Sequence, residues 1–193
     1  MRKIGEIVQL QVQPVSLKQG EKNNRYYAPA GLRAVPAMRL TGQGVVGLAE
    51  GDEIGDVHHA DHPESKNRAL TNGISVNFTS HYTQMQARFG DHLYTGCAGE
   101  NILVATDESF DLATVVGGLV IETQDGQQIQ LTEVCVAEPC APFSEYALHL
   151  DQRPPAELMK ATLQFLDGGM RGFYCQAAGE PAVVQVGDGL FVV

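Results

Sequence analysis

The sequence predicts a mainly β protein whose strands close into a barrel, with a few short helices between them. Short runs that alternate in polarity or are rich in β-branched residues dominate the chain, and Gly, Asn and Asp separate them. The runs are EIVQLQVQPV, SVNF, ENILVAT, TVVGGLVIET, QQIQLTEVCVA and PAVVQVGDGLFVV. The 193 residues, of which 44% are hydrophobic, suffice for a sizeable core, and we expect residues 1–193 to form one domain.

The strongest hairpin signal lies in VIETQDGQQIQLTEV, where the Asp-Gly pair at 125–126 separates two strand-like runs. In the second of these runs, Ile129 and Leu131 fall on one face, whereas Val134 and Val136 fall on the other. The strand therefore either buries both faces or contains a β-bulge. A closed barrel accounts for either arrangement.

Two helices are expected between the strands. The first is HYTQMQARF, with Ser80 as its N-cap and Gly90 as its left-handed end. Its apolar face consists of Tyr82, Met85 and Phe89. The second begins near the Pro-Pro pair at 154–155, which the first turn tolerates, and ends at the Gly-Gly pair at 168–169. Its inward face is expected to contain Leu158, Met159, Leu163 and Leu166.

The stretch LKQGEKNNRYYAPAGLRAVPAMRL, residues 17–40, is interpreted as a long polar loop or an insertion. The N-terminal strand and this loop, residues 1–46, are assigned to the same domain as the rest of the chain. The sequence contains no internal repeat.

Composition excludes several classes of protein. The formal net charge is −10 with 13 Lys and Arg residues, which argues against a broad nucleic-acid footprint. No apolar run approaches the roughly 18 residues of a membrane span, and the N-terminus lacks the apolar segment of a signal peptide. We therefore expect a cytoplasmic protein without a membrane or nucleic-acid partner. An anionic ligand would need a local basic pocket.

The stretch VCVAEPCAPF contains two of the four cysteines. A cytosolic chain of this size does not need disulfides, so all four are expected to be free thiols. A zinc site is not expected, because zinc knuckles need paired C-x2-C motifs and this spacing is C-x4-C. Cys135 lies in an apolar run and is expected to be a buried strand residue. Cys140 follows Pro139 where the strand gives way to a loop, and Cys97 lies in a Gly-flanked loop that could be exposed.

Four stretches, taken in order, resemble the MOSC domain family, the molybdenum cofactor sulfurase C-terminal domains. They are GLAEGDEIGDVHHADHPESKNRAL, GCAGENI, VCVAEPCAPF and GGMRGFYCQAAGEPAVVQVGDGLFVV. The resemblance runs from about Gly47 to the C-terminus, and the layout is most similar to the stand-alone bacterial members of the YiiM type. It implies a MOSC-type β-barrel that binds molybdenum cofactor (molybdopterin), an anionic pterin dithiolene with a phosphate tail, through one cysteine thiolate on molybdenum.

On this resemblance, Cys140 is the expected metal ligand and catalytic residue, since thiolate is the softest anionic ligand that a protein offers. Arg68 is the preferred phosphate or pterin contact, because a guanidinium group matches phosphate geometry. His58 and His59 are further candidate contacts in the same positive stretch, although paired histidines are more often structural. Arg171, between glycines in GGMRGFY, is a second basic candidate.

The motif GENI has two interpretations. Glu100 and Asn101 supply an acceptor and an amide that could orient the nitrogen edge of a pterin. Alternatively, the motif is a turn whose Asn caps its own backbone. The sequence leaves both open.

Three functions are compatible with these residues. The first is a molybdenum-dependent oxidoreductase that acts on N-hydroxylated compounds and receives electrons from separate proteins, because the chain has no flavin or iron–sulfur motif. The second is a sulfur carrier, or cofactor-handling protein, in which Cys140 bears a persulfide supplied by a sulfur-donor protein. The third is a non-catalytic binding module. Pyridoxal phosphate is expected to belong to the desulfurase domain fused to some relatives, because no lysine here lies in a recognisable Schiff-base context.

Overall fold

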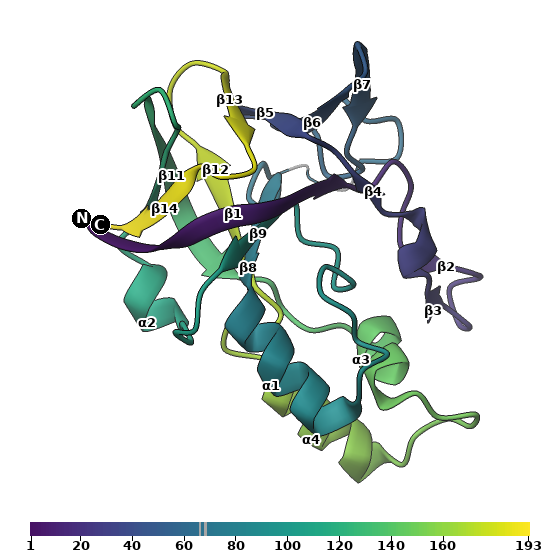
Figure 1. Cartoon of the computed structure of the whole chain (residues 1–193). Coiled ribbons are helices and arrows are strands. Elements are labelled where there is room, and N and C mark those ends of the chain that lie inside the picture. Colours follow the sequence, from purple (N-terminus) through teal and green to yellow (C-terminus); the bar gives the residue numbers. More distant parts are fainter. Residues whose placement is uncertain (66, 68) are drawn as a thin grey trace.

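Seven strands form a closed barrel in the part of the chain that the computed structural model describes, residues 1–65, 67 and 69–193 (Figure 1). Their order is β14-β10-β11-β12-β8-β9-β1, and pairing of β1 with β14 closes the ring. β8 and β9 run parallel, whereas the other neighbours are antiparallel. The strands are β1 (Arg2–Val12), β8 (Ile74–Phe78), β9 (Ile102–Ala105), β10 (Leu119–Glu122), β11 (Gln128–Val136), β12 (Phe173–Ala177) and β14 (Gly189–Val192). The predicted mainly β barrel is confirmed.

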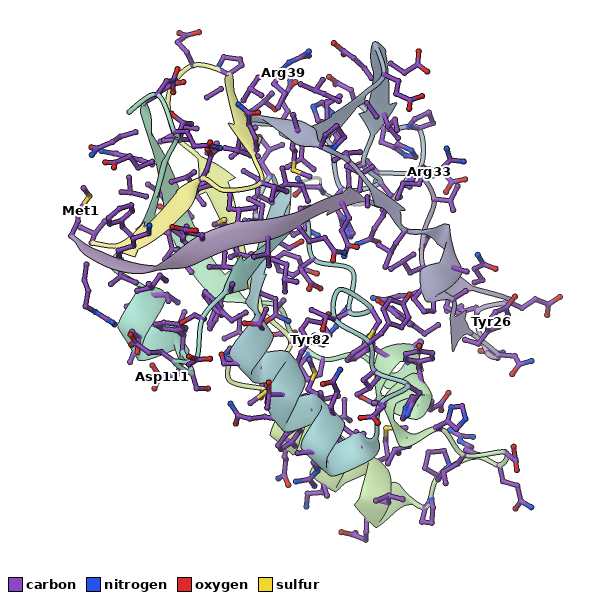
Figure 2. The ribbon with its side chains drawn as sticks, in the orientation of Figure 1. Met1, Tyr26, Arg33, Arg39, Tyr82 and Asp111 are labelled. Atoms are coloured by element: carbon purple, nitrogen blue, oxygen red, sulfur yellow. The ribbon has the colours of Figure 1, made fainter. Side chains whose placement is uncertain are left out.

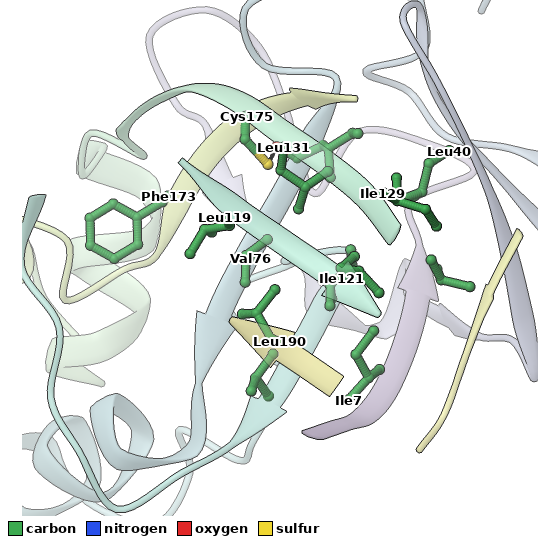
Figure 3. Packing of buried hydrophobic residues seen from close by; sticks show 14 of the residues in the cluster. Ile7, Leu40, Val76, Leu119, Ile121, Ile129, Leu131, Phe173, Cys175 and Leu190 are labelled. Carbon is green, nitrogen blue, oxygen red and sulfur yellow. Dashed lines mark hydrogen bonds between the residues drawn. The ribbon is translucent and has the colours of Figure 1, made fainter. Parts of the chain in front are cut away.

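The barrel is filled by aliphatic side chains that alternate along its strands. Ile7, Val76, Ile121 and Leu190 come from four different strands and are almost fully buried, and Figure 3 shows them meeting inside the ring. Alternation places every second residue of a strand inside, so four to five residues per strand are enough to fill the interior.

A smaller sheet of order β13-β5-β6-β7 packs beside the barrel. Its strands are β5 (Ala37–Thr41), β6 (Gly44–Ala49), β7 (Asp52–Gly55) and β13 (Ala182–Gln185). Three shorter strands and one 3-10 turn precede it in sequence: β2 (Lys18–Gln19), β3 (Tyr26–Tyr27), η1 (Pro29–Gly31) and β4 (Arg33–Ala34). The prediction of a long loop at 17–40 is therefore wrong. Leu17 and Tyr27 are buried, and they hold the β2–β3 hairpin against the body of the protein.

The hairpin at the Asp-Gly pair is confirmed, with β10 and β11 paired from Leu119 to Glu122 and Gly126 at φ +88°. The β-bulge is also confirmed, because the β11–β12 register shifts between Thr132 and Cys135 and Glu133 adopts φ +52°. The bulge keeps Val134 inside and turns Cys135 to the surface, so the prediction of a buried Cys135 is wrong.

Four helices lie in the described part of the chain: α1 (Thr79–Phe89), α2 (Leu112–Val115), α3 (Ala141–Leu148) and α4 (Ala156–Leu166). Figure 1 shows α1 and α4 next to each other below the barrel. Phe89 of α1 and Phe165 of α4 pack edge to face, with their ring centroids 5.4 Å apart. A second core cluster, which includes Tyr82, Met85 and Phe143, fills the space between α1, α3 and α4. No helix among the described residues has the length and apolar character needed to cross a membrane.

Several details of the predicted helices need correction. Ser80 does not cap α1, because its hydroxyl donates to the Glu108 carbonyl, whereas Gly90 ends the helix at φ +112° as expected. In α4, Leu158 was predicted to face inward but is 40% exposed, whereas Thr162 is fully buried. The predicted loop after Cys140 is the first turn of α3.

Leu70 adopts φ +58° in a turn, and β8 begins only at Ile74.

Candidate functional site

A cavity of about 210 Å³ opens at one end of the barrel. Its wall is built from the ends of β1, β8, β11 and β12, the β2–β3 hairpin and two loops. The lining includes Gln13, Lys18, Arg25, Tyr27, Val57, His58, Ser75, Gly99, Glu100, Ala137, Arg171 and Tyr174. Segments far apart in the sequence thus meet because the barrel brings their strand ends together.

The cavity is locally basic. Among the described residues of its wall, Lys18, Arg25, His58 and Arg171 are basic, and Glu100 is the carboxylate. The chain as a whole carries a formal charge of −10. The structure therefore contains the local basic pocket that an anionic ligand would need.

Arg171 is fixed on the cavity wall by three contacts. Its Nη1 donates to the Glu138 carbonyl at 3.0 Å, its Nη2 donates to the Ala98 carbonyl at 3.4 Å, and its guanidinium lies 5.0 Å from the Phe143 ring centroid. Its Nε is buried without a partner among the described residues. Gly172, at φ +102°, lets the chain pass close to β8, where a Cβ would lie 2.6 Å from the Val76 carbonyl oxygen. The guanidinium is thus held in place, and its buried Nε–H has no acceptor among the described residues.

Cys140 lies three residues after Ala137, which lines the cavity. It is the N-cap residue of α3, is half-buried, and packs against the second core cluster. Burial, the largest single effect, lowers the pKa of Arg171, but Cys140, Tyr27 and Tyr174 together outweigh it, so the pKa is raised. The Cys140 sulfur is therefore close enough to Arg171 to interact with its charge, although Cys140 is not itself a lining residue.

The other cysteines are placed differently from one another. All four are free thiols, as expected. Cys97 is buried, so the expectation that it could be exposed is wrong, and burial followed by the Glu100 charge raises its pKa. Cys175 is enclosed in the barrel core. Cys135 is exposed, and partial burial, then Glu138 and Glu133, raise its pKa.

Glu100 is a buried carboxyl group at the cavity wall, with 3% of its surface exposed. The Tyr82 hydroxyl donates to its Oε2 at 2.9 Å and accepts from the Ala98 amide at 2.9 Å; Figure 2 marks Tyr82 on α1. Its Oε1 has no partner among the described residues. Burial raises the pKa of Glu100 from its ordinary 4.5 to about 7. The group therefore changes charge near neutral pH and has one oxygen available.

His58 is oriented by a buried network. Asp56 is fully buried, and its Oδ1 accepts from the His58 amide at 2.8 Å and contacts His58 Nδ1 at 3.1 Å. Asp56 Oδ2 accepts from the Gln13 amide at 2.7 Å and from Asn101 Nδ2 at 3.0 Å. Asn101 Oδ1 in turn accepts from the Ser75 amide and hydroxyl. The network holds the His58 ring on the cavity wall.

The predicted site residues are thus only partly brought together. His58, Glu100 and Arg171 line the cavity. Asn101 is not a lining residue, and its side-chain amide donates a hydrogen bond to Asp56. His59 lines a different hollow, and its Nδ1 accepts from the Asp61 amide. Arg68, like its neighbour Lys66, lies outside the described residues.

Sequence reasoning missed the contribution of the N-terminal segment. Lys18, Arg25 and Tyr27 reach the cavity from the stretch interpreted as a polar loop, and Gln13 reaches it from the end of β1. The available signal was the run KQGEKNNRYY, in which basic residues flank a turn next to two tyrosines. Within the described residues, no three His, Cys, Asp or Glu side chains gather so that they could hold a metal ion on their own.

Comparison with known proteins gives a consistent picture. The family model described as "MOSC domain" matches residues 57–190. No curated protein matches the sequence. Among solved structures, the YUAD protein from Bacillus subtilis superposes with a TM-score of 0.58 and 15% identity, covering 96% of this chain and 93% of that chain.

YiiM proteins from two bacteria also superpose. YiiM from Geobacillus stearothermophilus gives a TM-score of 0.51 and 16% identity, covering 100% of this chain and 74% of that chain. YiiM from Escherichia coli gives 0.52 and 14%, covering 100% and 70%. At these identities, the structures show a shared fold.

Proposed function

The chain belongs to the MOSC domain family, and from this membership we propose that its basic cavity binds molybdenum cofactor, with Cys140 as the protein ligand of molybdenum. The observation that carries the proposal is the pair of unused buried groups at the cavity wall. Among the described residues, neither Arg171 Nε, a donor, nor Glu100 Oε1, an acceptor, has a hydrogen-bond partner. Because an unpaired buried polar atom costs about 1–3 kcal/mol, such a pair is typical of a site that a ligand completes.

The residues present fit the chemistry of this cofactor. Its phosphate tail and dithiolene are anionic and suit Lys18, Arg25 and Arg171, whereas pterin N–H groups suit the free oxygen of Glu100. Cys140 offers the soft sulfur ligand beside the positive charge of Arg171. His58, held by Asp56, offers a further hydrogen-bonding group.

When bound, the cofactor would supply two-electron chemistry that removes an oxygen atom from an N-hydroxylated compound. The overall conversion is R–NHOH + 2e⁻ + 2H⁺ → R–NH₂ + H₂O, and the electrons would come from a separate electron-transfer protein. Glu100 holds a proton at the cavity wall near neutral pH, so it is our candidate for one of the two protons consumed.

The position of Cys140 also suits an alternative, a sulfur carrier. Cys140 is half-buried and is not among the residues that line the cavity, so a second protein could reach it. In this function Cys140 carries a persulfide; the terminal sulfur passes to the acceptor and the Cys140 thiolate is left behind.

Metal and pterin analysis tests the proposal. The chain is expressed with molybdate in a host that makes the cofactor, and molybdenum and oxidised-pterin fluorescence are measured for the native sequence, Cys140→Ser and Cys135→Ser. We expect Cys140→Ser to lose most of its molybdenum, whereas Cys135→Ser, which alters an exposed thiol, retains both signals. Full molybdenum content in Cys140→Ser, or no pterin in any sample, would contradict the proposal.

Two further measurements separate the alternatives. Turnover of an N-hydroxylated compound with an artificial electron donor supports the reductase. An additional sulfur on the Cys140 peptide in mass spectrometry, without turnover, supports the sulfur carrier.

A further inference from the structure

A second hollow adjoins the cavity on the side of α3. It has a volume of about 320 Å³ and lies between α3, the loop that follows it and the β2–β3 hairpin. We call it the tyrosine groove and define it by Tyr26, Tyr27, Glu145, Tyr146, His149 and Asp151. Tyr27 lines both the groove and the cavity, so one side chain forms the wall between them.

Three aromatic rings face this groove. Tyr27 is fixed, because its hydroxyl donates to the Cys97 carbonyl at 2.9 Å and its ring contacts Tyr146 at 5.5 Å between centroids. Tyr26 is 56% exposed, and its hydroxyl donates a 3.2 Å hydrogen bond to Gln19. Figure 2 shows Tyr26 at the outer end of the hairpin. The groove therefore has one rigid aromatic wall and one exposed ring at its rim.

The charge of the groove is opposite to that of the cavity. Glu145 and Asp151 line it together with His149, and no Lys or Arg is among its described lining residues. Neither carboxylate forms an ion pair within the described part of the chain. Tyrosine faces attract cations through the ring quadrupole, and two nearby carboxylates add to that attraction. A planar ring can also stack on Tyr26 or Tyr146.

We propose that the tyrosine groove binds an aromatic cation, a planar aryl group that carries a guanidinium, amidinium or ammonium group. Its size suits a small molecule of this kind. α3 begins directly after Cys140 and places Glu145 and Tyr146 in the groove. The groove is therefore a subsite for the non-reacting part of a substrate whose reacting group would meet the cofactor held by Cys140. This last assignment rests on the proposed function, whereas binding of the cation does not.

Matched small molecules test the proposal on the isolated protein. Phenylguanidinium is titrated against phenylurea, which has the same shape without the charge, and against ethylguanidinium, which has the charge without the ring. Calorimetry gives the affinities, and NMR shift changes locate the site. We expect phenylguanidinium to bind about 10-fold more tightly than either comparison compound. Equal affinities for the three compounds would overturn the proposal.

Variants in the groove locate the binding. Tyr26→Ala should weaken phenylguanidinium binding by about 3- to 10-fold, and Asp151→Asn by about 2- to 5-fold. The controls are Tyr94→Ala, an exposed tyrosine outside the groove, and Glu21→Gln, an exposed carboxylate outside the groove, and both should bind normally. Unchanged binding in both groove variants would overturn the proposal, even if some binding exists elsewhere on the protein.

The same titration distinguishes this proposal from the cofactor proposal. Cys140→Ser, which we expect to lose molybdenum, should bind phenylguanidinium as well as the native sequence does. If protein that contains molybdenum does not bind phenylguanidinium, the groove proposal is contradicted and the cofactor proposal is not. Binding in protein that never acquires molybdenum contradicts the cofactor proposal alone.

Discussion

Glu100 is the residue whose charge most affects the stability of the cavity wall. Its carboxyl group is buried, accepts one hydrogen bond from Tyr82 and has a pKa raised to about 7. A raised pKa in the folded state means that the native protein binds this proton more readily than the unfolded chain does. The stability that Glu100 contributes is therefore fully present below about pH 4.5 and is lost as the pH rises through about 7.

Glu100→Gln should remove this pH dependence, because Gln accepts the same hydrogen bond but does not titrate. The free energy of unfolding of the variant should rise relative to the native sequence by on the order of 3 kcal/mol between pH 4.5 and pH 8. Urea unfolding at several pH values measures the difference. Glu21→Gln, at an exposed position, serves as the control and should show no such trend. A difference that stays constant with pH would show that Glu100 does not titrate in this range.

Single residues of the site were predictable where a motif marked them. His58, Glu100 and Arg171 stand in short polar motifs next to glycines or strand ends, and the structure places all three on one wall. Lys18 and Arg25 stand in no such motif, and only the packing of Tyr27 brings their hairpin to the cavity. Side-chain identity therefore indicated chemistry, but it did not show which segments the barrel brings together.

At the scale of elements, the turn between α4 and β12 positions Arg171. Gly168 and Gly169 both have positive φ, +69° and +111°, and they reverse the chain before Arg171 enters the cavity wall. Gly169 packs directly on the buried Phe173 ring, where a Cβ would approach more closely than real Cβ atoms do. At Gly168, no described residue other than its own chain neighbours lies within 4 Å of the position that a Cβ would take.

These neighbouring glycines give a matched pair of variants. Gly168→Ala should cost about 1 kcal/mol, the conformational penalty of a left-handed alanine. Gly169→Ala should cost about 2–4 kcal/mol, because displacement of Phe173 adds to a similar penalty. Urea unfolding measures both free energies. Equal losses for the two variants would show that Phe173 moves aside without cost.

Elements were predictable from sequence in proportion to their length and periodicity. The β10–β11 hairpin carries an Asp-Gly turn and two alternating runs. The change of parity in the second run was compatible with a bulge or with two buried faces, and the structure has the bulge. α3 has eight residues, too few to show a helical repeat, and a proline in its first turn that resembles a loop. β2 and β3 have two residues each, so no alternation exists to detect.

In the whole molecule, the two ends of the chain complete one barrel. β14 pairs with β1 on one side and with β10 on the other, so the last strand of the chain links the first strand to one from the middle of the sequence. Figure 1 shows the two termini side by side. Barrel strands also carry cavity residues at or near their ends, namely Gln13 directly after β1 and Tyr174 near the start of β12. Stability of the barrel and integrity of the cavity should therefore be coupled.

Leu190→Ala tests this coupling. Leu190 is fully buried on β14 inside the barrel, so truncation should cost about 2–5 kcal/mol. Val193→Ala, three residues later, alters a side chain that is 70% exposed and should change stability by less than about 0.5 kcal/mol. In a chain of this length, each kcal/mol corresponds to about 2–4 °C in Tm.

Two spectroscopic signals follow the two regions during that unfolding. Far-UV circular dichroism reports mainly on the strands, whereas fluorescence comes from the six tyrosines, because the chain has no tryptophan. Tyr27 and Tyr174 line the cavity and Tyr82 lies in the second core cluster, so fluorescence reports on the cavity side of the molecule. Since barrel and cavity share strands, Leu190→Ala should lower the urea midpoint of both signals together. A lowered midpoint in circular dichroism with an unchanged midpoint in fluorescence would show instead that the cavity side unfolds independently of barrel closure.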